Sequence, residues 1–111
     1  MTKTRNKLID SIRGEMSSDE VIGKLSRTFS VLGDSTRTRI IFALSNHELC
    51  VAELAVLLGM SHSAISHQMR ALKDLDLVGC RKDGRKSYYS LNDKHIENLF
   101  KEGLKHVLEK L

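Results

Sequence analysis

Apolar residues recur every three or four positions through most of the chain, which is the spacing of amphipathic helices. The pattern becomes regular after Ser17, which we predict to cap a helix together with Glu20 three residues later. Gly33 is expected to end this helix in the left-handed conformation, because glycine adopts it without steric cost. The predicted apolar face of the helix consists of Val21, Ile22, Leu25, Phe29 and Leu32.

Three shorter helices are predicted next, over residues 34–46, 51–58 and 62–75. Asp34 or Ser35 is expected to cap the first of them, and Ser61 the third. Gly59 stands where the second helix should end. The first of these helices carries the residues that we expect to be buried: Ile40, Ile41, Ala43 and Leu44.

The pattern then changes to two short runs rich in β-forming residues, 77–82 and 86–91. Asp83-Gly84 between them suits the positive φ angles of a tight turn, so we predict a β-hairpin. The fold class expected from these elements is mainly α with one hairpin. Four or five helices should precede the hairpin, and one helix should follow it.

The two ends of the chain are organised differently. Residues 1–16 are basic and weakly periodic, so they form either a frayed helix or a disordered arm. Residues 17–111 are expected to form one domain, because no proline, repeat or low-complexity tract marks a linker within them. Their last element is a helix that begins at Asn92 or Asp93.

The composition is typical of a small globular protein, with 111 residues of which 41% are hydrophobic and 29% charged. No apolar run approaches the roughly 18 residues that a membrane span requires. The first residues also lack a hydrophobic signal segment, so we expect a cytoplasmic location and no membrane partner. A net charge of +4 favours a polyanionic partner. Cys50 and Cys80 form no CxxC pair and are expected to be free thiols.

The two helices over 51–58 and 62–75 have the spacing of a helix-turn-helix. Ala55 is small where the second helix must approach closely, and Gly59 tolerates the left-handed conformation in the turn. Ile65 is placed to fill the space between the helices. An unrelated helical hairpin is the alternative interpretation.

The second of these helices has a polar face suited to DNA. At about 100° per residue it exposes Ser63, His67 and Arg70, with Ser66 on the flank. Short hydrogen-bonding groups and a cation in the first half of a helix suit contacts to base edges and phosphates. We therefore predict a recognition helix that carries these four residues.

Basic residues gather at the predicted hairpin that follows. Lys82 and Arg85 lie beside its tip, and Arg81 and Lys86 lie just outside it. A charge run of this kind is most often a solvated face. Directly after a recognition helix, it also suits a wing whose cations follow the DNA backbone and add affinity without sequence information.

The closing helix carries two pairs of metal-binding residue types. Asp93 at the cap position can place its carboxylate beside His95. His106 and Glu109, three residues apart, share one helix face. The two histidines are eleven residues apart, or about 16.5 Å along the helix axis. Since zinc-nitrogen distances are about 2.0 to 2.1 Å, one ion cannot join both pairs within one chain.

A second copy of the helix, packed antiparallel across a two-fold axis, would bring the two pairs together and create two sites per dimer. The apolar seam that such packing requires is present: Ile96, Leu99, Phe100, Gly103 and Val107. Two imidazoles with two carboxylates form a closed tetrahedral set that suits Zn(II), with Co(II) tolerated. Ordinary solvated surface residues are the alternative. A set with no open position argues against an enzyme.

Together, these motifs resemble one family. The stretch "ELCVAELAVLLGMSHSAISHQMRALKDLDLVGCRKDGRKSYYSLNDKHI", with the upstream "LGDSTRTRIIFAL", is similar to the ArsR/SmtB family of winged helix-turn-helix, metal-sensing repressors. The resemblance covers about residues 26–111. It implies a homodimer formed through the first and last helices, and a repressor that leaves double-stranded operator DNA when metal binds.

The resemblance also implies roles for individual residues. Ser63, Ser66 and His67 would contact DNA. The zinc site would consist of Asp93 and His95 from one subunit and two residues of the partner subunit, His106 and Glu109. Many members of the family have a second metal site on "ELCVC", where this chain has "ELCVAEL". Cys50 with Glu53 is therefore an incomplete, vestigial set, because Ala52 replaces the second cysteine.

The sequence thus predicts a transcriptional repressor that responds to Zn(II), with Co(II) or Cd(II) as other effectors, and not an enzyme. Two alternatives stay open. One is a regulator of the same fold that senses thiol oxidation through Cys50 or Cys80. The other is a dimeric zinc-binding protein without a specific operator.

Overall fold

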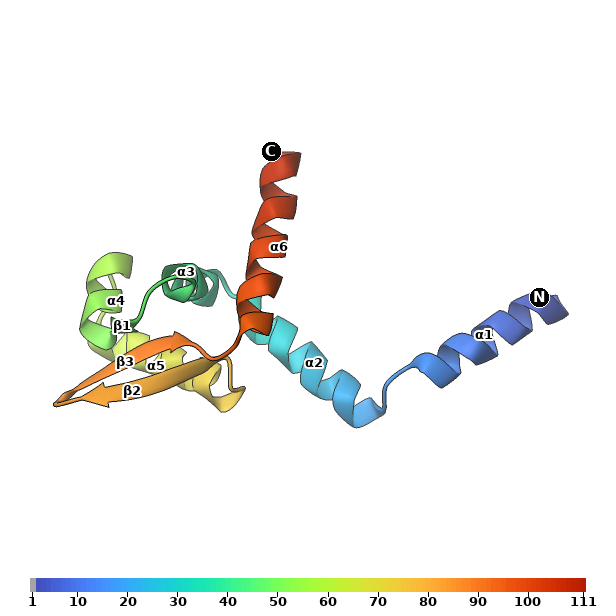
Figure 1. The fold of residues 1–111 in the computed structure, drawn as a ribbon, viewed down its shortest axis with the longest axis horizontal. Coiled ribbons are helices and arrows are strands. Elements are labelled where there is room, and N and C mark those ends of the chain that lie inside the picture. Colours follow the sequence, from blue (N-terminus) through green and yellow to red (C-terminus); the bar gives the residue numbers. More distant parts are fainter. Residues whose placement is uncertain (1) are drawn as a thin grey trace.

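The computed structural model describes residues 2–111. These residues form, in chain order, α1 (Lys3–Glu15), α2 (Asp19–Leu32), α3 (Ser35–Leu44), β1 (Leu49–Cys50), α4 (Val51–Leu58), α5 (His62–Asp74), β2 (Val78–Asp83), β3 (Lys86–Leu91) and α6 (Lys94–Lys110). Figure 1 shows α3, α4, α5 and the strands gathered at one end, with α2 and α1 leading away from them. The expected fold class, mainly helical with a β-hairpin wing, is confirmed.

The core lies between α3, α4, α5 and the start of β2. Its largest fully buried side chains include Ile40 from α3, Leu54 from α4, and Ile65 and Leu72 from α5. Ile41, Ala43 and Leu44 are also buried, as predicted. Full burial of one such aliphatic side chain stabilises the fold by about 1.5 to 3 kcal/mol. The helix-turn-helix is therefore the most firmly packed part of the molecule.

The helices at the two ends are packed differently. Every residue of α2 and α6 is at least partly exposed, and so is every residue of α1. On α2 the predicted apolar face is exposed to solvent, since Val21 is 51% exposed and Phe29 is 52% exposed. The segment 1–16, for which a frayed helix or a disordered arm was expected, contains α1 capped by Thr2. None of the helices in residues 2–111 has the length and apolar content needed to cross a membrane.

The three strands form one antiparallel sheet in the order β1-β3-β2. The β2-β3 hairpin is paired from Val78↔Leu91 to Asp83↔Lys86. β1 adds only two residue pairs to the other side of β3. This strand was not predicted, because two residues are too few to show an alternating pattern.

Two predicted helix ends are wrong in detail. Ser18 caps α2 and not Ser17, since the Ser18 hydroxyl accepts the amide of Val21 at 3.3 Å. Gly33 is right-handed, with φ −77° and ψ −2°, because the cap of the next helix follows at once at Asp34. The free carbonyl of Leu32 is satisfied instead by the hydroxyl of Thr38, which donates to it at 2.9 Å.

The predicted position of the hairpin turn is also wrong, by one residue. Asp83 still belongs to β2 and pairs with Lys86, so the two turn residues are Gly84 and Arg85. Gly84 has φ +63°, and the first turn position is one at which hairpins favour glycine. The shift changes every pairing along the hairpin, which matters for Arg81.

Candidate DNA-binding face and metal-binding residues

The turn between α4 and α5 has the geometry that the sequence predicts. Gly59 has φ +64°, and Ala55 and Ile65 are buried at the crossing of the two helices. The hydroxyl of Ser61 caps α5 by accepting the amide of Ala64 at 3.0 Å. A β-branched or bulky residue at Gly59 would be strained, because L residues rarely adopt this conformation.

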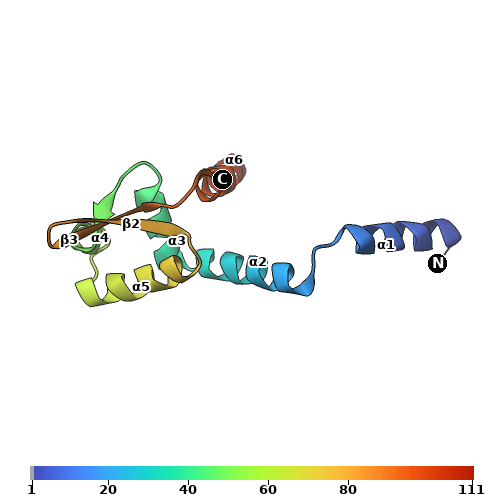
Figure 2. The same ribbon diagram turned by 60° about the horizontal axis from the view of Figure 1, so that its bottom comes forward.

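The predicted recognition residues all lie on the exposed side of α5. Ser63, Ser66, His67 and Arg70 are exposed, and the opposite side packs into the core through Ile65, Met69 and Leu72. In Figure 2, α5 runs along one edge of the molecule, and α6 lies at the opposite edge. The face that would meet DNA is therefore separate from the helix that carries the predicted metal ligands.

One contact between α3 and α5 was not evident from the sequence. The Arg37 side chain, in the first turn of α3, donates from Nε to Oε1 of Gln68 at 2.9 Å. Both side chains are partly buried. The two residues are 31 positions apart, so no local pattern could have indicated the pair. The bond ties the middle of the recognition helix to α3.

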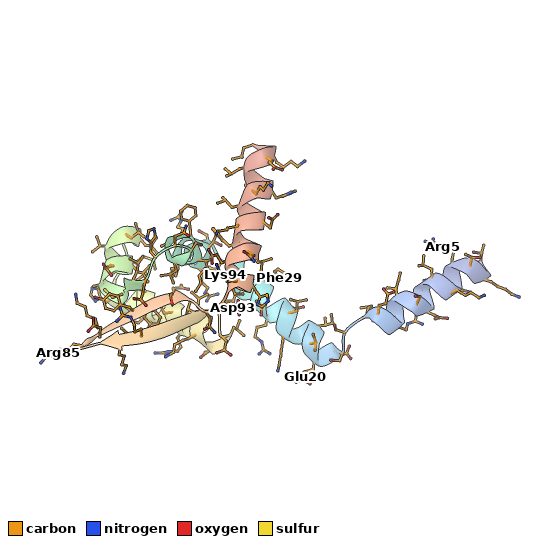
Figure 3. The ribbon with its side chains drawn as sticks, viewed as in Figure 1. Arg5, Glu20, Phe29, Arg85, Asp93 and Lys94 are labelled. Carbon is orange, nitrogen blue, oxygen red and sulfur yellow. The ribbon has the colours of Figure 1, made fainter. Side chains whose placement is uncertain are left out.

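The hairpin extends past the end of the helix-turn-helix, and its basic residues are exposed. Figure 3 shows Arg85 at the tip, pointing away from the body. Lys82 and Lys86 are exposed on the two strands that lead to it. The tip therefore presents cations to solvent on an arm beside α5, as a wing that follows a DNA backbone would require.

Arg81 differs from its neighbours because its guanidinium is engaged within the protein. It donates to both carboxylate oxygens of Glu48, with the shortest distance 2.7 Å, from Nη2 to Oε1. It also lies over the ring of Tyr88, 5.0 Å from its centroid. The hydrogen bond from Arg81 lowers the pKa of Glu48, and the same bond raises the pKa of Arg81.

At the start of α6, Asp93 and His95 come together as predicted. Oδ1 of Asp93 caps the helix by accepting the amides of His95, at 2.9 Å, and Ile96, at 3.2 Å. Nδ1 of His95 lies 3.5 Å from the same oxygen, and the His95 side chain is 93% exposed. The cap bonds do not occupy Oδ2 of Asp93. A carboxylate oxygen and an imidazole are thus held side by side at the surface.

His106 and Glu109 lie near the other end of α6, and both are exposed. The length of the helix separates them from Asp93 and His95. In residues 2–111, no three His, Cys, Asp or Glu side chains are close enough together to hold one metal ion. The protomer therefore separates the two predicted pairs of residues and does not form the predicted site by itself.

An open apolar groove of about 550 Å³ runs between α2, α3 and α6. The seam predicted on α6 lines one side of it, and Phe29, Ile41 and Phe42 line the other. Leu99 and Val107 remain 42% and 54% exposed. Gly103 also faces the groove, and a Cβ at this position would meet no atom within 4 Å. The protomer therefore leaves this apolar face of α6 partly uncovered.

The two cysteines differ in their accessibility. Cys50 is buried at the start of α4, where its amide donates to Oε1 of Glu53 at 3.0 Å and lowers the pKa of that carboxyl. This bond gives Glu53 a capping role that needs no metal. Cys80 is exposed on β2 opposite Tyr89, whose pKa is raised by burial and then by Cys80.

Comparison with known proteins gives consistent matches. Residues 34–79 match the profile for "Bacterial regulatory protein, arsR family". The chain is 40% identical to "Transcriptional repressor SmtB homolog" of Synechocystis sp., over 91% of this chain and 76% of that protein. It is 37% identical to "Cadmium resistance transcriptional regulatory protein CadC homolog" of Staphylococcus aureus, over 77% of this chain and 71% of that protein.

Among solved structures, one similar fold is the homodimeric winged helix-turn-helix DNA-binding domain of a possible ArsR-family transcriptional regulator from Mycobacterium bovis. Its TM-score is 0.73 at 26% identity, and the match covers 86% of this chain and 89% of that one. The family-profile match over residues 34–79 spans α4 and α5, which form the helix-turn-helix.

Proposed function

Since the chain belongs to the arsR family of bacterial regulatory proteins, we propose that it is a metal-responsive transcriptional repressor. In this proposal a homodimer binds double-stranded operator DNA in the cytoplasm and is released when Zn(II) binds between the two α6 helices. The observation that carries the metal part is the position of the ligands. Asp93 and His95 are paired at one end of α6, and His106 and Glu109 lie at the other.

The DNA-binding part rests on the two exposed features at one edge of the molecule. Ser63, Ser66 and His67 offer hydrogen-bonding groups on α5, and Arg70 offers a cation. Lys82 and Arg85 add cations on the wing. We assign base contacts to the α5 residues and phosphate contacts to the wing cations, since side chains on a recognition helix read base edges while wing cations follow the backbone.

The homodimer rests on the apolar surfaces that one protomer leaves open. The exposed face of α2 and the groove beside α6 are continuous, because Phe29 of α2 lines the groove. Soluble monomers rarely expose a large continuous apolar surface, and such a surface usually marks a contact with a partner. A second copy related by a two-fold axis would cover both surfaces, and the similar Mycobacterium bovis domain is described as homodimeric.

In the proposed dimer the α6 helices are antiparallel, so each Asp93-His95 pair meets His106 and Glu109 of the other protomer. The donor set fits zinc, because two imidazoles and two carboxylates form the closed tetrahedral set of a structural or regulatory site. Co(II) has a similar preference. Cd(II) is a further effector to test, because one relative is named as a cadmium-resistance regulatory protein. A bound ion would supply charge neutralisation across the seam.

Release follows if the ion changes the spacing between the two recognition helices. Successive major grooves on one face of DNA are about 34 to 36 Å apart, so only one spacing of the α5 helices is productive. An ion that favours another spacing lowers DNA affinity, and DNA lowers ion affinity by the same factor.

Two alternatives are weighed against this proposal. Exposure of Cys80 favours a regulator of the same fold that responds to thiol oxidation, whereas buried Cys50 is poorly placed for it. The other alternative is a zinc-binding dimer with no operator of its own, for which DNA binding would be weak and independent of sequence.

The experiment is a zinc titration of the dimer bound to its own upstream DNA, in which fluorescence anisotropy reports the amount of bound DNA. Zinc should release the wild-type protein, and His106→Ala should bind the same DNA but resist release. Cys80→Ser should respond to zinc as the wild type does. Normal release of His106→Ala by zinc would contradict the ligand assignment. Release by peroxide or diamide alone, lost in Cys80→Ser, would favour thiol sensing.

A further inference from the structure

Four basic residues are found at the wing, and they are not equivalent. Among residues 2–111, the ion pairs of the wing cations involve Arg81 and not Lys82, Arg85 or Lys86. Arg81 pairs with Glu48, and more distantly with Asp83, at 3.8 Å. The Nε and Nη2 donors of Arg81 are occupied by Glu48, whose negative charge also offsets the charge of the guanidinium. Arg81 is therefore the least available of the four for a direct contact with DNA.

The ion pair between Arg81 and Glu48 spans the three-stranded sheet. Glu48 directly precedes β1, Tyr88 lies on β3, and Arg81 lies on β2. Because the strand order is β1-β3-β2, the pair crosses the middle strand. Arg81 and Tyr88 are directly paired in the register, and the guanidinium lies over the ring. One side-chain bridge thus joins both outer strands across the central one.

The backbone connection at the same place is weak. Only Leu49↔Tyr89 and Cys50↔Tyr88 pair β1 with the hairpin. A two-stranded hairpin has little stability of its own in water. β1 continues directly into α4, so the bridge connects the outer strand of the wing to the strand that enters the helix-turn-helix. Val78 at the base of the hairpin is buried in the core, so loss of the bridge would affect mainly the outer part of the wing, beyond Arg81.

We propose that Arg81 is a positioning residue, held by Glu48 across the ring of Tyr88, which fixes the angle of the wing, while Lys82 and Arg85 contact the DNA backbone. The inference rests on the proposed function, because it assumes that the wing lies against DNA. It assigns an acidic residue, Glu48, a favourable role in binding a polyanion. Simple charge considerations predict the opposite sign for that residue, which makes the inference testable.

The decisive variant is Glu48→Gln, compared with the wild type on upstream DNA and on an unrelated duplex at several salt concentrations. If Glu48 were only a surface charge, its removal would strengthen binding to both duplexes, because repulsion is reduced. We expect weaker binding instead, by at most about fivefold, because an effect that acts through positioning cannot exceed the strength of the exposed ion pair itself. Thermal unfolding of each variant verifies that it is folded.

Two further variants separate positioning from phosphate contact. Arg85→Gln should lower the slope of log K against log salt by about 0.9, the value for one lost phosphate contact. Arg81→Gln should weaken binding while it changes that slope by clearly less. The double variant Glu48→Arg/Arg81→Glu, which reverses the pair, should recover part of the lost affinity. A slope change in Arg81→Gln equal to that of Arg85→Gln would overturn the inference, and so would tighter binding by Glu48→Gln.

The same measurements distinguish the positioning role of Arg81 from the proposed operator function. Wing contacts to the backbone do not depend on sequence, so the comparison of Glu48→Gln with the wild type is decisive on either duplex. Equal affinity of the wild type for both duplexes would contradict the proposed operator function and leave the Glu48 result valid. Failure of the wild type to bind either duplex would overturn both.

Discussion

The ring of Phe42 on α3 meets the ring of Phe100 on α6 edge to face, with centroids 5.8 Å apart and planes at 85°. α3 also carries Arg37, which donates to Gln68 on the recognition helix. These contacts connect the helix with the proposed metal ligands to the helix that would read DNA. We therefore expect a change in the position of α6 to reach α5 through α3, which the next variant tests.

Replacement of Phe100 by leucine should weaken this connection. An edge-to-face aromatic pair contributes about 0.5 to 1.5 kcal/mol beyond its area burial, which is comparable to a typical coupling between two sites of about 1 to 3 kcal/mol. We expect Phe100→Leu to bind zinc with normal stoichiometry and to bind DNA. The factor by which zinc lowers its DNA affinity should be about two- to tenfold smaller than in the wild type. Phe29→Leu, in the same groove but outside the pair, is the control. An unchanged zinc effect would exclude Phe100 from the coupling.

The proposed sharing of each zinc site between two protomers predicts complementation in mixed dimers. Asp93→Ala/His95→Ala and His106→Ala/Glu109→Ala should each lose both sites as homodimers. A heterodimer of the two variants contains one complete site, since one protomer still has His106 and Glu109 and the other still has Asp93 and His95. Calorimetric titration should give one zinc per heterodimer. No recovery would contradict the antiparallel arrangement.

Gly103 should matter for assembly and not for folding of the protomer. A Cβ at this position meets no atom outside its own stretch of α6 within 4 Å, yet it would project into the groove that we assign to the partner. Gly103→Val is expected to raise the dimer dissociation constant, measured by sedimentation equilibrium. Far-ultraviolet circular dichroism should retain the helical signal. Gly14→Val, in the exposed helix α1, is a comparison at a site outside the groove, and a dimer unaffected by Gly103→Val would place the contact elsewhere.

Ser63 and Arg85 should affect DNA binding in different ways. Ser63→Ala would remove the proposed base-edge contact and is expected to reduce the preference for the operator over mismatched duplexes, by about 0.5 to 1.5 kcal/mol for one hydrogen bond. Arg85→Gln should weaken binding to all duplexes alike. Competition assays with single-base variants of the operator distinguish the two outcomes. Uniform weakening by Ser63→Ala would remove it from the recognition surface.

Acid should weaken the fold through three surface carboxylates with lowered pKa values. Hydrogen bonds from Arg81, from Cys50 and from Lys101 lower the pKa of Glu48, Glu53 and Glu97 respectively, below the usual 4.5. A group whose folded-state pKa is lowered stabilises the protein above its unfolded-state pKa, and this stabilisation is lost as the pH falls through the folded-state value. Thermal midpoints should therefore fall below about pH 4.5. In Glu53→Gln this decline should be shallower, and an identical decline would show that the Cys50-Glu53 bond does not contribute.

The helical part of the fold could be predicted because its signals are local. Ser61, Gly59 and Asp93 act within three or four residues of their own positions, as helix caps and as a turn. Ile65 and Leu72 follow the helical period and are fully buried. Capping and amphipathic spacing both depend on neighbours in the sequence, so they are visible without the fold.

The wing shows what could not be predicted. With Asp83 and Gly84 as the turn residues, Arg81 would face Lys86, and no bridge to Tyr88 would exist. The observed turn moves by one residue, which shifts each partner by two and places Tyr88 opposite Arg81. Glu48, which precedes β1 and is 33 positions from Arg81 in the sequence, completes the bridge. Such long-range contacts depend on the register and topology of the whole sheet.

The candidate metal residues are an intermediate case. The spacing of His95 and His106 indicates that they cannot share an ion in one chain, and the protomer brings only Asp93 and His95 together. The remaining two ligands would come from a second protomer. Sequence spacing can define that requirement, but the angle and register of two packed helices are decided by side chains on both of them.

The exposed apolar faces of α2 and α6 also bear on how much of the regulator a cell must make. When protomers are stable only in pairs, the amount of functional protein depends on the square of the protomer concentration wherever dissociation is appreciable. A small change in synthesis would then give a larger change in occupied operators. Phe29 and Val107, which touch neither DNA nor metal in our proposal, would in this way help to set the expression level at which repression begins.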